Sequence, residues 1–352
     1  MPDTNLTPEK IAANIRKGVF KPHIYLTNLA LAYFQKPGYF VSRTMFPIVP
    51  VPLSSARFFE FDRGDLARNN VSRKPEFGHV APAIWGKRDH FYHCEVDQVI
   101  TGIDQISTLD FQRIGAPGVA DPRRAPIRFI AEQMSIHLDD VWAKRYFNPD
   151  SWSNVWTGSD TPDASNGEFY FFDSDNSDPV RFFNLLSTTM LQSGLREPNK
   201  ICMGVNVFGA LQTNPTILER IKYQGSEANP AAVTTNVLAQ LFKVDEIVVA
   251  KSVINRAPVG KPDDMQFICN PNSLLLTYTT NAPAIEEPSA GYTFAWDMLG
   301  NGQHIAVQQY FGEPANHTEF IEGLLCTEPQ ITSKDLGVFM KDAVSPDYIP
   351  TP

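Results

Sequence analysis

The clearest pattern of apolar positions in the chain predicts one long helix, from about Pro126 to Phe147. Apolar side chains recur there three and four residues apart, a spacing that gathers them into one stripe along a helix. The stripe consists of Ile127, Ile130, Ala131, Met134, Leu138, Val141 and Trp142. Pro126 suits the first helical position, and Asn148-Pro149 is typical of a helix end. With a rise of 1.5 Å per residue, the helix would be about 33 Å long.

A second pattern lies earlier in the chain, where two alternating segments flank a highly charged one. RFFEF (57–61) and HFYHCEV (90–96) alternate between apolar and polar residues, as strands do. Residues 57–90 carry seven basic and five acidic side chains, and they hold too few apolar residues for a domain of their own. We therefore expect a long two-stranded excursion with a loose tip near 78–86.

Such an excursion is expected to gain order from a partner, since an isolated hairpin is marginally stable in water. One interpretation is an ordinary surface insertion, and the other is an arm that contacts another subunit. Under the second interpretation, the charged side chains of the segment are candidates for contacts between subunits. These candidates are Arg57, Arg63, Asp65, Arg68, Arg73, Lys74, Glu76, Lys87 and Arg88.

The second half of the chain predicts a compact module of mixed strands and helices. Asp178 and Pro179 suit the N-cap and first position of a helix that ends near Gly194. From Asn199 onward, short buried strands alternate with helical segments. Strands are expected at 201–205 and 244–250, and helices at 216–221 and 231–242. A separate short helix is expected at 7–18.

Composition narrows the classes of function. The net charge of −9, from 30 basic and 39 acidic residues, argues against a protein that binds nucleic acid through a basic face. No apolar run approaches the roughly 18 residues that a membrane-spanning helix needs. The cysteines are far apart and lie in apolar stretches, so we expect them to be reduced and buried. They are Cys94, Cys202, Cys269 and Cys326.

The sequence shows no recognisable catalytic motif. It has no glycine-rich phosphate loop, no Gly-x-Ser-x-Gly motif and no Cys-x-x-Cys pair. His90, His93 and Cys94 form a candidate metal cluster, but on a strand the two histidines point to opposite faces, which is poor geometry for a shared zinc. The acidic segment 157–179 lacks the glycine and the closing glutamate of a calcium-binding EF-hand loop. We therefore expect no cofactor, no metal and no catalytic residue.

Three stretches carry a family resemblance. They are RFFEFDRGD (57–65), FDSDNSDPV (172–180) and NKICMGVNVFGALQTNPTILERIKY (199–223), the last followed by LAQLFKVDEIVVAKSVIN (238–255). With the order of elements over nearly the whole chain, they resemble the major capsid proteins of tailed double-stranded-DNA bacteriophages, which have the Hong Kong 97-type fold.

The resemblance implies an α+β fold with five parts in chain order. They are an N-terminal arm (1–55), an extended two-stranded loop (56–98), a peripheral domain (99–198) with a spine helix (126–147), an α/β axial domain (199–318), and a return to the peripheral domain with a C-terminal tail (319–352).

The resemblance also implies a structural role without enzymatic activity. Subunits of this family self-assemble as hexamers and pentamers into an icosahedral head shell, which encloses the DNA genome without sequence specificity. The extended loop lies over the adjacent subunit, and the spine helix straightens or bends as a precursor shell expands. The implied partners are other copies of the chain, a separate scaffolding protein, a portal and, in some members, a decoration protein. The implied location is the virion capsid after assembly in the host cytoplasm, with no membrane association.

Two other functions remain open at this point. One is an encapsulin-like cellular compartment built on the same fold, although the long N-terminal arm and the proline-rich connections favour a virus. The other is a metallohydrolase that uses His90, His93 and Cys94.

Some family members also crosslink a loop lysine to an asparagine of a neighbour. Lys74 and Lys87 lie in the corresponding region, but nothing in the sequence identifies the asparagine or the catalytic glutamate.

Overall fold

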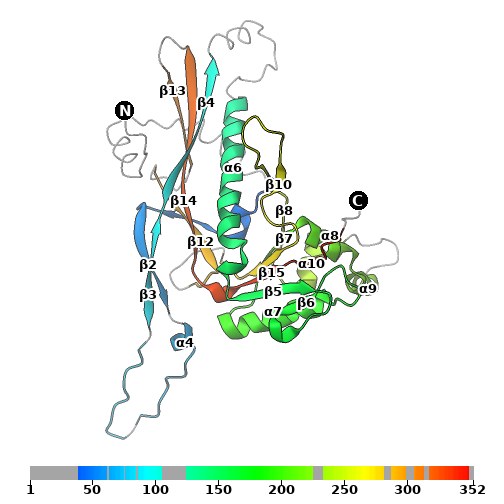
Figure 1. Ribbon diagram of the computed structural model, residues 1–352. Helices are drawn as coiled ribbons and strands as arrows, with labels where there is room; N and C mark the ends of the chain where they lie inside the picture. Colours follow the sequence, from blue (N-terminus) through cyan, green and yellow to red (C-terminus); the bar gives the residue numbers. More distant parts are fainter. Residues whose placement is uncertain are drawn as a thin grey trace.

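The computed structural model describes residues 39–61, 63–74, 76–84, 86–104, 124–224, 233–280, 287–298, 305–312 and 317–348. Figure 1 shows three parts: a long helix beside an elongated sheet, a compact α/β part near one end of that helix, and a narrow ribbon that projects away from both. The helix expected at 7–18 lies outside the described residues.

The long helix α6 (Arg124–Tyr146) confirms the helix predicted at 126–147. It packs on a five-stranded sheet whose longest strand is β14 (Thr318–Ile331). Strand β14 pairs antiparallel with three others, and β12 in turn pairs parallel with β1. These strands are β1 (Ile48–Val51), β4 (Glu95–Asp104), β12 (Gly291–Trp296) and β13 (Ile305–Phe311).

The core between helix and sheet consists of the predicted stripe and the inward-facing residues of the strands. Its buried members include Ile127, Ile130, Met134, Leu138, Ile305, Val307, Ile321 and Leu325. A glycine permits the close approach of α6 to β14. A Cβ atom at Gly323 would lie 2.4 Å from Met134 Cε and 2.6 Å from Ile130 Cγ2, well inside van der Waals contact.

The compact α/β part contains a six-stranded sheet with helices packed against it. The strand order is β6 (Glu168–Tyr170), β5 (Asn154–Ser159), β15 (Gly337–Lys341), β11 (Leu274–Thr277), β7 (Lys200–Gly204) and β8 (Glu246–Ala250). The helices are α7 (Pro179–Gly194), α8 (Val205–Thr213), α9 (Pro215–Gln224) and α10 (Thr235–Phe242). Residues of all four helices share one hydrophobic core with the strands.

Local signals in the sequence located these elements correctly. The Asp178 side chain accepts the backbone N–H of Arg181 and caps α7, as predicted. Asn214 separates α8 from α9 and accepts backbone N–H groups of the first turn of α9.

The sheets divide the chain differently from the ranges expected for the peripheral and axial domains. Strands β5 and β6 and helix α7 lie within 99–198, yet they share a sheet and a core with β7 and β8. Strands β12 and β13 lie within 199–318, yet they belong to the sheet beside α6. Apolar alternation identifies a strand but not its partner, because pairing depends on contacts between residues far apart in the chain.

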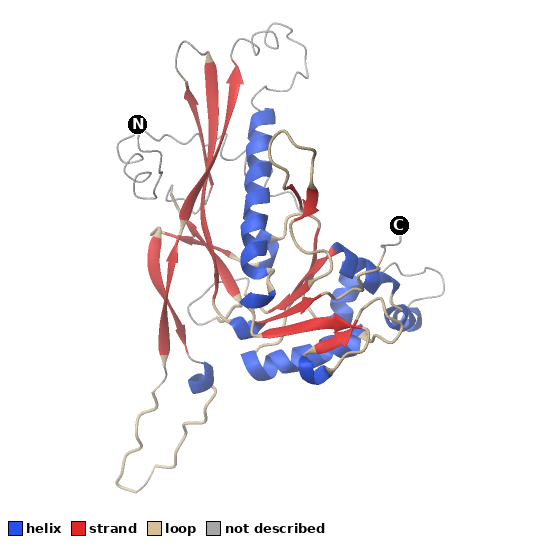
Figure 2. Cartoon of the chain, viewed as in Figure 1, coloured by secondary structure: helices blue, strands red, loops and turns tan. Residues whose placement is uncertain are grey.

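Two antiparallel hairpins stand outside the larger sheets (Figure 2). The ribbon consists of β2 (Ser55–Phe61) and β3 (Lys87–His93), with the short helix α4 (Arg63–Leu66) after β2. The second hairpin consists of β9 (Val253–Asn255) and β10 (Met265–Phe267). Before the ribbon, the short helix α3 (Ser42–Met45) packs against α6. Within the described part of the chain, no helix is both long enough and apolar enough to span a membrane.

Candidate assembly interface

The two-stranded excursion expected from the sequence is present as the ribbon. Phe58 pairs with His90 and Ala56 with Tyr92 in an antiparallel register. In Figure 1 the ribbon points away from the rest of the chain, and the connection between its strands extends further still. We call residues 67–84, which lie in this connection, the ribbon tip.

An aromatic cluster fixes the root of the ribbon. The ring of Phe294 on β12 lies 4.6 Å from that of Tyr92 and 5.3 Å from that of Phe58. The His90 ring stacks on Phe58 at 5.4 Å. Cys94, just beyond the ribbon, is buried, and its backbone N–H donates to the Ser54 carbonyl at 2.8 Å. The direction of the ribbon is therefore set by core packing against β12.

Three of the candidate contact residues have an identified partner within their own chain. Arg57 lies 3.9 Å from the Asp89 carboxylate and stacks over the Phe91 ring at 4.8 Å. The Asp65 carboxylate accepts the Gly86 backbone N–H at 3.0 Å and lies 3.6 Å from Arg68. Exposed ion pairs of this kind contribute at most about 1 kcal/mol. They arrange the ribbon and the base of its tip rather than contribute much stability.

The remaining candidates differ in their surroundings. Arg73, Lys74 and Glu76 are exposed, and no interaction within the described residues is recorded for them. Lys87 and Arg88, at the start of β3, are exposed, and each makes a contact within the chain. The Arg63 side chain lies outside the described residues. The structure thus does not gather the nine candidates into one cluster but distributes them along the ribbon and its tip.

Sequence reasoning missed the apolar side chains of the ribbon tip. Val71 and Ile84 have exposed fractions of 89% and 82%, and Phe77 is fully exposed. Phe77 also has a φ of 61°, a left-handed conformation that a phenylalanine seldom adopts. Burying such side chains is worth about 1.5–3 kcal/mol each relative to leaving them in water. Their signal was visible in the sequence as isolated apolar residues in a charged segment.

The three residues of the candidate metal cluster, His90, His93 and Cys94, do not point toward a common site. His90 stacks on Phe58, His93 is exposed, and the buried Cys94 thiol donates a hydrogen bond to the Phe294 carbonyl at 3.7 Å. Among the residues that the structure describes, no group of three or more His, Cys, Asp or Glu side chains could hold a metal ion.

Several carboxylates of the acidic segment 157–179 form hydrogen bonds or ion pairs that stabilise the fold. Asp173 accepts the Ser345 backbone N–H at 3.0 Å, and Asp178 pairs with Arg220 at 2.9 Å in addition to capping α7. Asp163 accepts the hydroxyl and the backbone N–H of Ser165, and these two hydrogen bonds lower the pKa of Asp163.

The cysteines are buried and free, as expected. They also lie in two pairs that the sequence did not predict. Burial and a hydrogen bond with Cys269 raise the pKa of Cys202, and a hydrogen bond with Cys94 together with burial raises that of Cys326. The raised pKa keeps the thiols of Cys202 and Cys326 protonated and unreactive.

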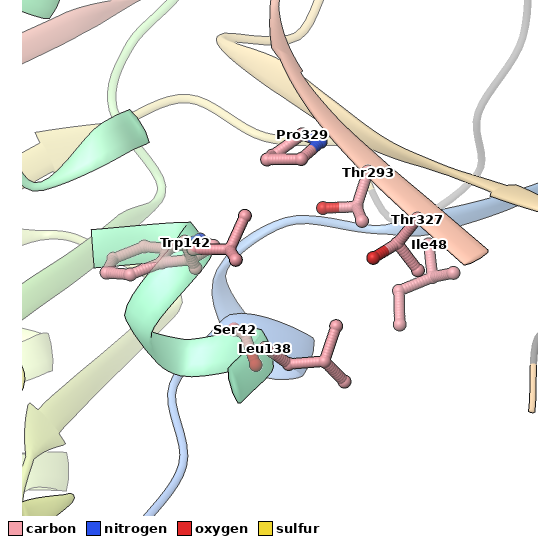
Figure 3. A pocket seen from close by; sticks show the side chains of 8 residues that line it. Ser42, Ile48, Leu138, Trp142, Thr293, Thr327 and Pro329 are labelled. Carbon is pink, nitrogen blue, oxygen red and sulfur yellow. The ribbon is translucent and has the colours of Figure 1, made fainter. Parts of the chain in front are cut away.

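A shallow pocket between α6, α3 and the five-stranded sheet has room for roughly one water molecule (Figure 3). Its lining is mostly apolar and contains no ionisable side chain. The lining residues are Ser42, Ile48, Leu138, Val141, Trp142, Thr293, Thr327 and Pro329. The pocket is a packing gap and offers no chemistry.

Polar side chains of α6 connect the helix to three other segments. His137 Nε2 donates to Asp97 of β4 at 2.9 Å, and this hydrogen bond raises the pKa of His137, with burial opposing the rise. Asp140 accepts Arg256 of the β9–β10 hairpin at 3.0 Å and also bonds Lys144. Burial alone would raise the pKa of Asp140, but these hydrogen bonds outweigh it and lower the pKa.

The third connection is buried. Asp139 accepts the backbone N–H groups of Val41 and Ser42, at 3.1 and 2.9 Å, and so holds the start of α3 against α6. Burial raises the pKa of Asp139, and the hydrogen bonds from Ser42 and Val41 oppose the rise. The segment before the ribbon is thereby fixed to the long helix.

Several known proteins are similar to this chain in sequence or in fold. No family model matches the sequence. In sequence, 238 residues are 22% identical to the major capsid protein of Burkholderia phage BcepMu, over 65% of this chain and 68% of that protein. In structure, the chain is similar to a phage-related protein from Bordetella bronchiseptica RB50, with a TM-score of 0.67, 19% identity and coverage of 92% of this chain and 97% of that one. It is also similar to a capsid chain of cyanophage P-SCSP1u, with a TM-score of 0.50, 10% identity and coverage of 88% and 90%.

The solved structures establish the fold, and the sequence relationship indicates the function. The α+β fold expected from the sequence, of the Hong Kong 97 type, is confirmed. The fold and the sequence relationship together make the chain similar to the major capsid proteins of phages with the Hong Kong 97-type fold.

Proposed function

We propose that this chain assembles as hexamers and pentamers into the icosahedral head shell of a phage with a double-stranded DNA genome. The observation that carries the proposal is the ribbon: a rigidly rooted projection whose apolar tip, including Val71, Phe77 and Ile84, is uncovered in the single chain. Apolar side chains exposed together on one projection are typical of a surface that a partner covers. In a shell, the adjacent subunit supplies that cover.

The candidate contact residues take a defined place in this proposal. Asp65 and Arg68 hold the base of the tip, and Arg57 holds the two strands of the ribbon together, through contacts within the chain. Arg73, Lys74 and Glu76 on the tip contact the neighbouring subunit. Lys87 and Arg88 lie at the base of the tip and contribute charge to the same surface, and Arg63 remains a candidate contact residue.

The two sheets support a revised proposal for the domains. The five-stranded sheet with α6 corresponds to the peripheral domain and its spine helix. The six-stranded sheet with α7, α8, α9 and α10 corresponds to the axial domain. The extended loop is the ribbon with its tip, and residues 1–55 form the N-terminal arm, which Asp139 fixes where it reaches α3.

Further partners follow from the same role. The shell is built in the host cytoplasm with a separate scaffolding protein and a portal, and a decoration protein is a further candidate. The DNA is held without sequence specificity, which agrees with a net charge of −9. The subunit acts through contact and not through catalysis. The relationship to a phage capsid protein supports a virus over an encapsulin-like compartment.

The proposal is tested by producing the chain alone and together with the scaffolding protein of its phage, and by examining the products by negative-stain microscopy and sedimentation. Closed shells or rings of subunits are expected. If only monomers or small oligomers form under all assembly conditions, and the purified protein contains bound zinc, the metallohydrolase alternative replaces the proposal.

A further inference from the structure

The β9–β10 hairpin has an apolar face with nothing over it in the single chain. Val253 pairs with Phe267 and Asn255 with Met265, so these four side chains share one face of the hairpin. Met265 is 67% and Phe267 42% exposed, and Val259 in the connecting turn is fully exposed. We call these five residues the hairpin face. Since a two-stranded hairpin has no interior, the hairpin face is covered only by packing against another surface.

The opposite side of the hairpin is fixed to the long helix. Ile254 packs into the core cluster that contains Trp142 of α6. Arg256 at the end of β9 donates to the Asp140 carboxylate at 3.0 Å. The hairpin face is therefore held in a defined direction, which makes it a docking platform rather than a loose loop.

The ribbon and the hairpin lie on opposite sides of α6 in Figure 1. Because the root of the ribbon is built into the aromatic cluster around Phe294, the tip points away from the hairpin of its own chain. In a closed ring of identical subunits, each copy presents two different patches, and one patch of each copy meets the other patch of the next. The ribbon tip and the hairpin face have the placement that such a ring requires.

Apart from Lys261 in the hairpin turn and Glu76 on the ribbon tip, the two surfaces also carry opposite charges. Asp263 and Asp264, just before β10, are exposed, and their side chains bond the neutral amides of Asn255 and Gln266 at 2.8 and 2.9 Å. No ion pair is recorded for either carboxylate within the described residues. The exposed Arg73 and Lys74 of the ribbon tip likewise have no recorded carboxylate partner in the described part of their own chain.

We propose that the ribbon tip of one copy docks on the hairpin face of the next copy. The apolar side chains of the tip cover the hairpin face, and Arg73 and Lys74 pair with Asp263 and Asp264. The inference rests on the proposed shell function and adds the surface that receives the ribbon.

Charge reversal in both surfaces tests the docking. Arg73→Glu with Lys74→Glu, and separately Asp263→Lys with Asp264→Lys, are each expected to lower the fraction of subunits in rings and shells about tenfold, which corresponds to about 1.4 kcal/mol. The quadruple variant restores the opposite charges across the contact, so assembly is expected to return to within about twofold of the wild type.

The matched control reverses two exposed carboxylates elsewhere, Asp160→Lys and Asp175→Lys. This pair is expected neither to weaken assembly nor to rescue the Arg73→Glu, Lys74→Glu variant. The docking is overturned if both charge-reversal variants assemble normally, or if the quadruple variant is not rescued. In either case, shells formed in parallel by the wild type still support the proposed function. If the wild type itself does not assemble, the proposed function fails first.

Cysteine crosslinking provides a second measurement that does not depend on charge. Phe77→Cys with Met265→Cys is expected to form disulfides between copies under a mild oxidant, seen as a ladder of linked subunits on a denaturing gel without reductant. Phe77→Cys with Leu191→Cys on the exposed face of α7 is the control and is expected to remain monomeric. A ladder in the control and none with Met265→Cys would place the tip on α7 and overturn the docking.

Discussion

The Asp139 carboxylate accepts the backbone N–H of Ser42 at 2.9 Å, although the two residues are 97 positions apart. Both are buried. The bond joins the segment that leads into the ribbon to the middle of the long helix. It therefore holds the segment before the ribbon, the part of the subunit proposed to reach a neighbour, in a fixed position on α6.

Removing this carboxylate should destabilise the subunit. Asp139→Ala leaves the N–H groups of Val41 and Ser42 buried without an acceptor, and a loss of about 2–4 kcal/mol in the free energy of unfolding is expected. Denaturant unfolding of the isolated subunit, followed by tryptophan fluorescence, measures the change. Asp139→Asn keeps an acceptor oxygen and should lose less. Equal stability of Asp139→Ala and the wild type would show that water replaces the carboxylate.

The contact between α6 and β14 should not tolerate a methyl group at Gly323. Gly323→Ala places its Cβ 2.4 Å from Met134 Cε and 2.6 Å from Ile130 Cγ2, and a loss of about 1–3 kcal/mol is expected. Adding Met134→Ala removes one of the two clashes, so the double variant should lose less than the sum of the single variants. Thermal unfolding of the wild type, the two single variants and the double variant measures this coupling.

Gly102→Ala is a milder control in the same sheet, because a Cβ atom there would lie 3.2 Å from its nearest neighbour, Thr318 Cγ2. Purely additive losses would mean that the helix moves away from the sheet.

The His137–Asp97 pair should make stability depend on pH. The hydrogen bond to Asp97 raises the pKa of His137 in the folded subunit above that in the unfolded chain. The stabilisation is fully present below the unfolded value of about 6.5 and is lost as the pH rises through the higher folded value. The other charged groups facing His137 are Asp140 and Lys144, which act in opposite directions.

His137→Gln should therefore show a smaller decrease in stability than the wild type between pH 5.5 and pH 8.5. Urea unfolding at constant ionic strength measures the difference. Parallel pH profiles for the two proteins would contradict a contribution from this pair. Because both side chains are partly exposed, added salt should weaken the effect.

The ribbon tip should be required for assembly but not for folding. Replacing residues 67–84 by a short Gly-Ser linker keeps β2, β3 and the aromatic root, so the circular dichroism spectrum and the thermal unfolding midpoint should change little. Sedimentation should nevertheless show subunits in place of stable shells. A variant that unfolds outright would show that the tip belongs to the core of its own chain.

Local features of the structure were predictable from the sequence. The apolar stripe from Ile127 to Trp142 predicted α6 because helix periodicity depends only on residues three and four apart. Asp178 and Pro179 predicted the start of α7 because capping is decided within one turn. Alternation in RFFEF and HFYHCEV predicted the two strands of the ribbon in the same way.

Several functional features depended on residues far apart in the chain. Nothing near Asp139 in the sequence indicates that it binds the amides of Val41 and Ser42, or that His137 pairs with Asp97. Sheet membership was also undetermined, since β12 and β13 carry the same alternation whichever sheet they join. The uncovered tip around Phe77 and the hairpin face around Met265 became visible only as exposure in the fold.

The sequence by itself determined the helices, the strands, the charged excursion and the family resemblance, because these depend on short-range periodicity, capping and composition. Only the tertiary structure decided which strands pair in the two larger sheets, which carboxylates hold α3 and the β9–β10 hairpin to α6, and which apolar side chains stay uncovered. The physical reason is that burial is a property of the whole packed chain: the same phenylalanine is core or contact surface according to what the rest of the molecule places over it.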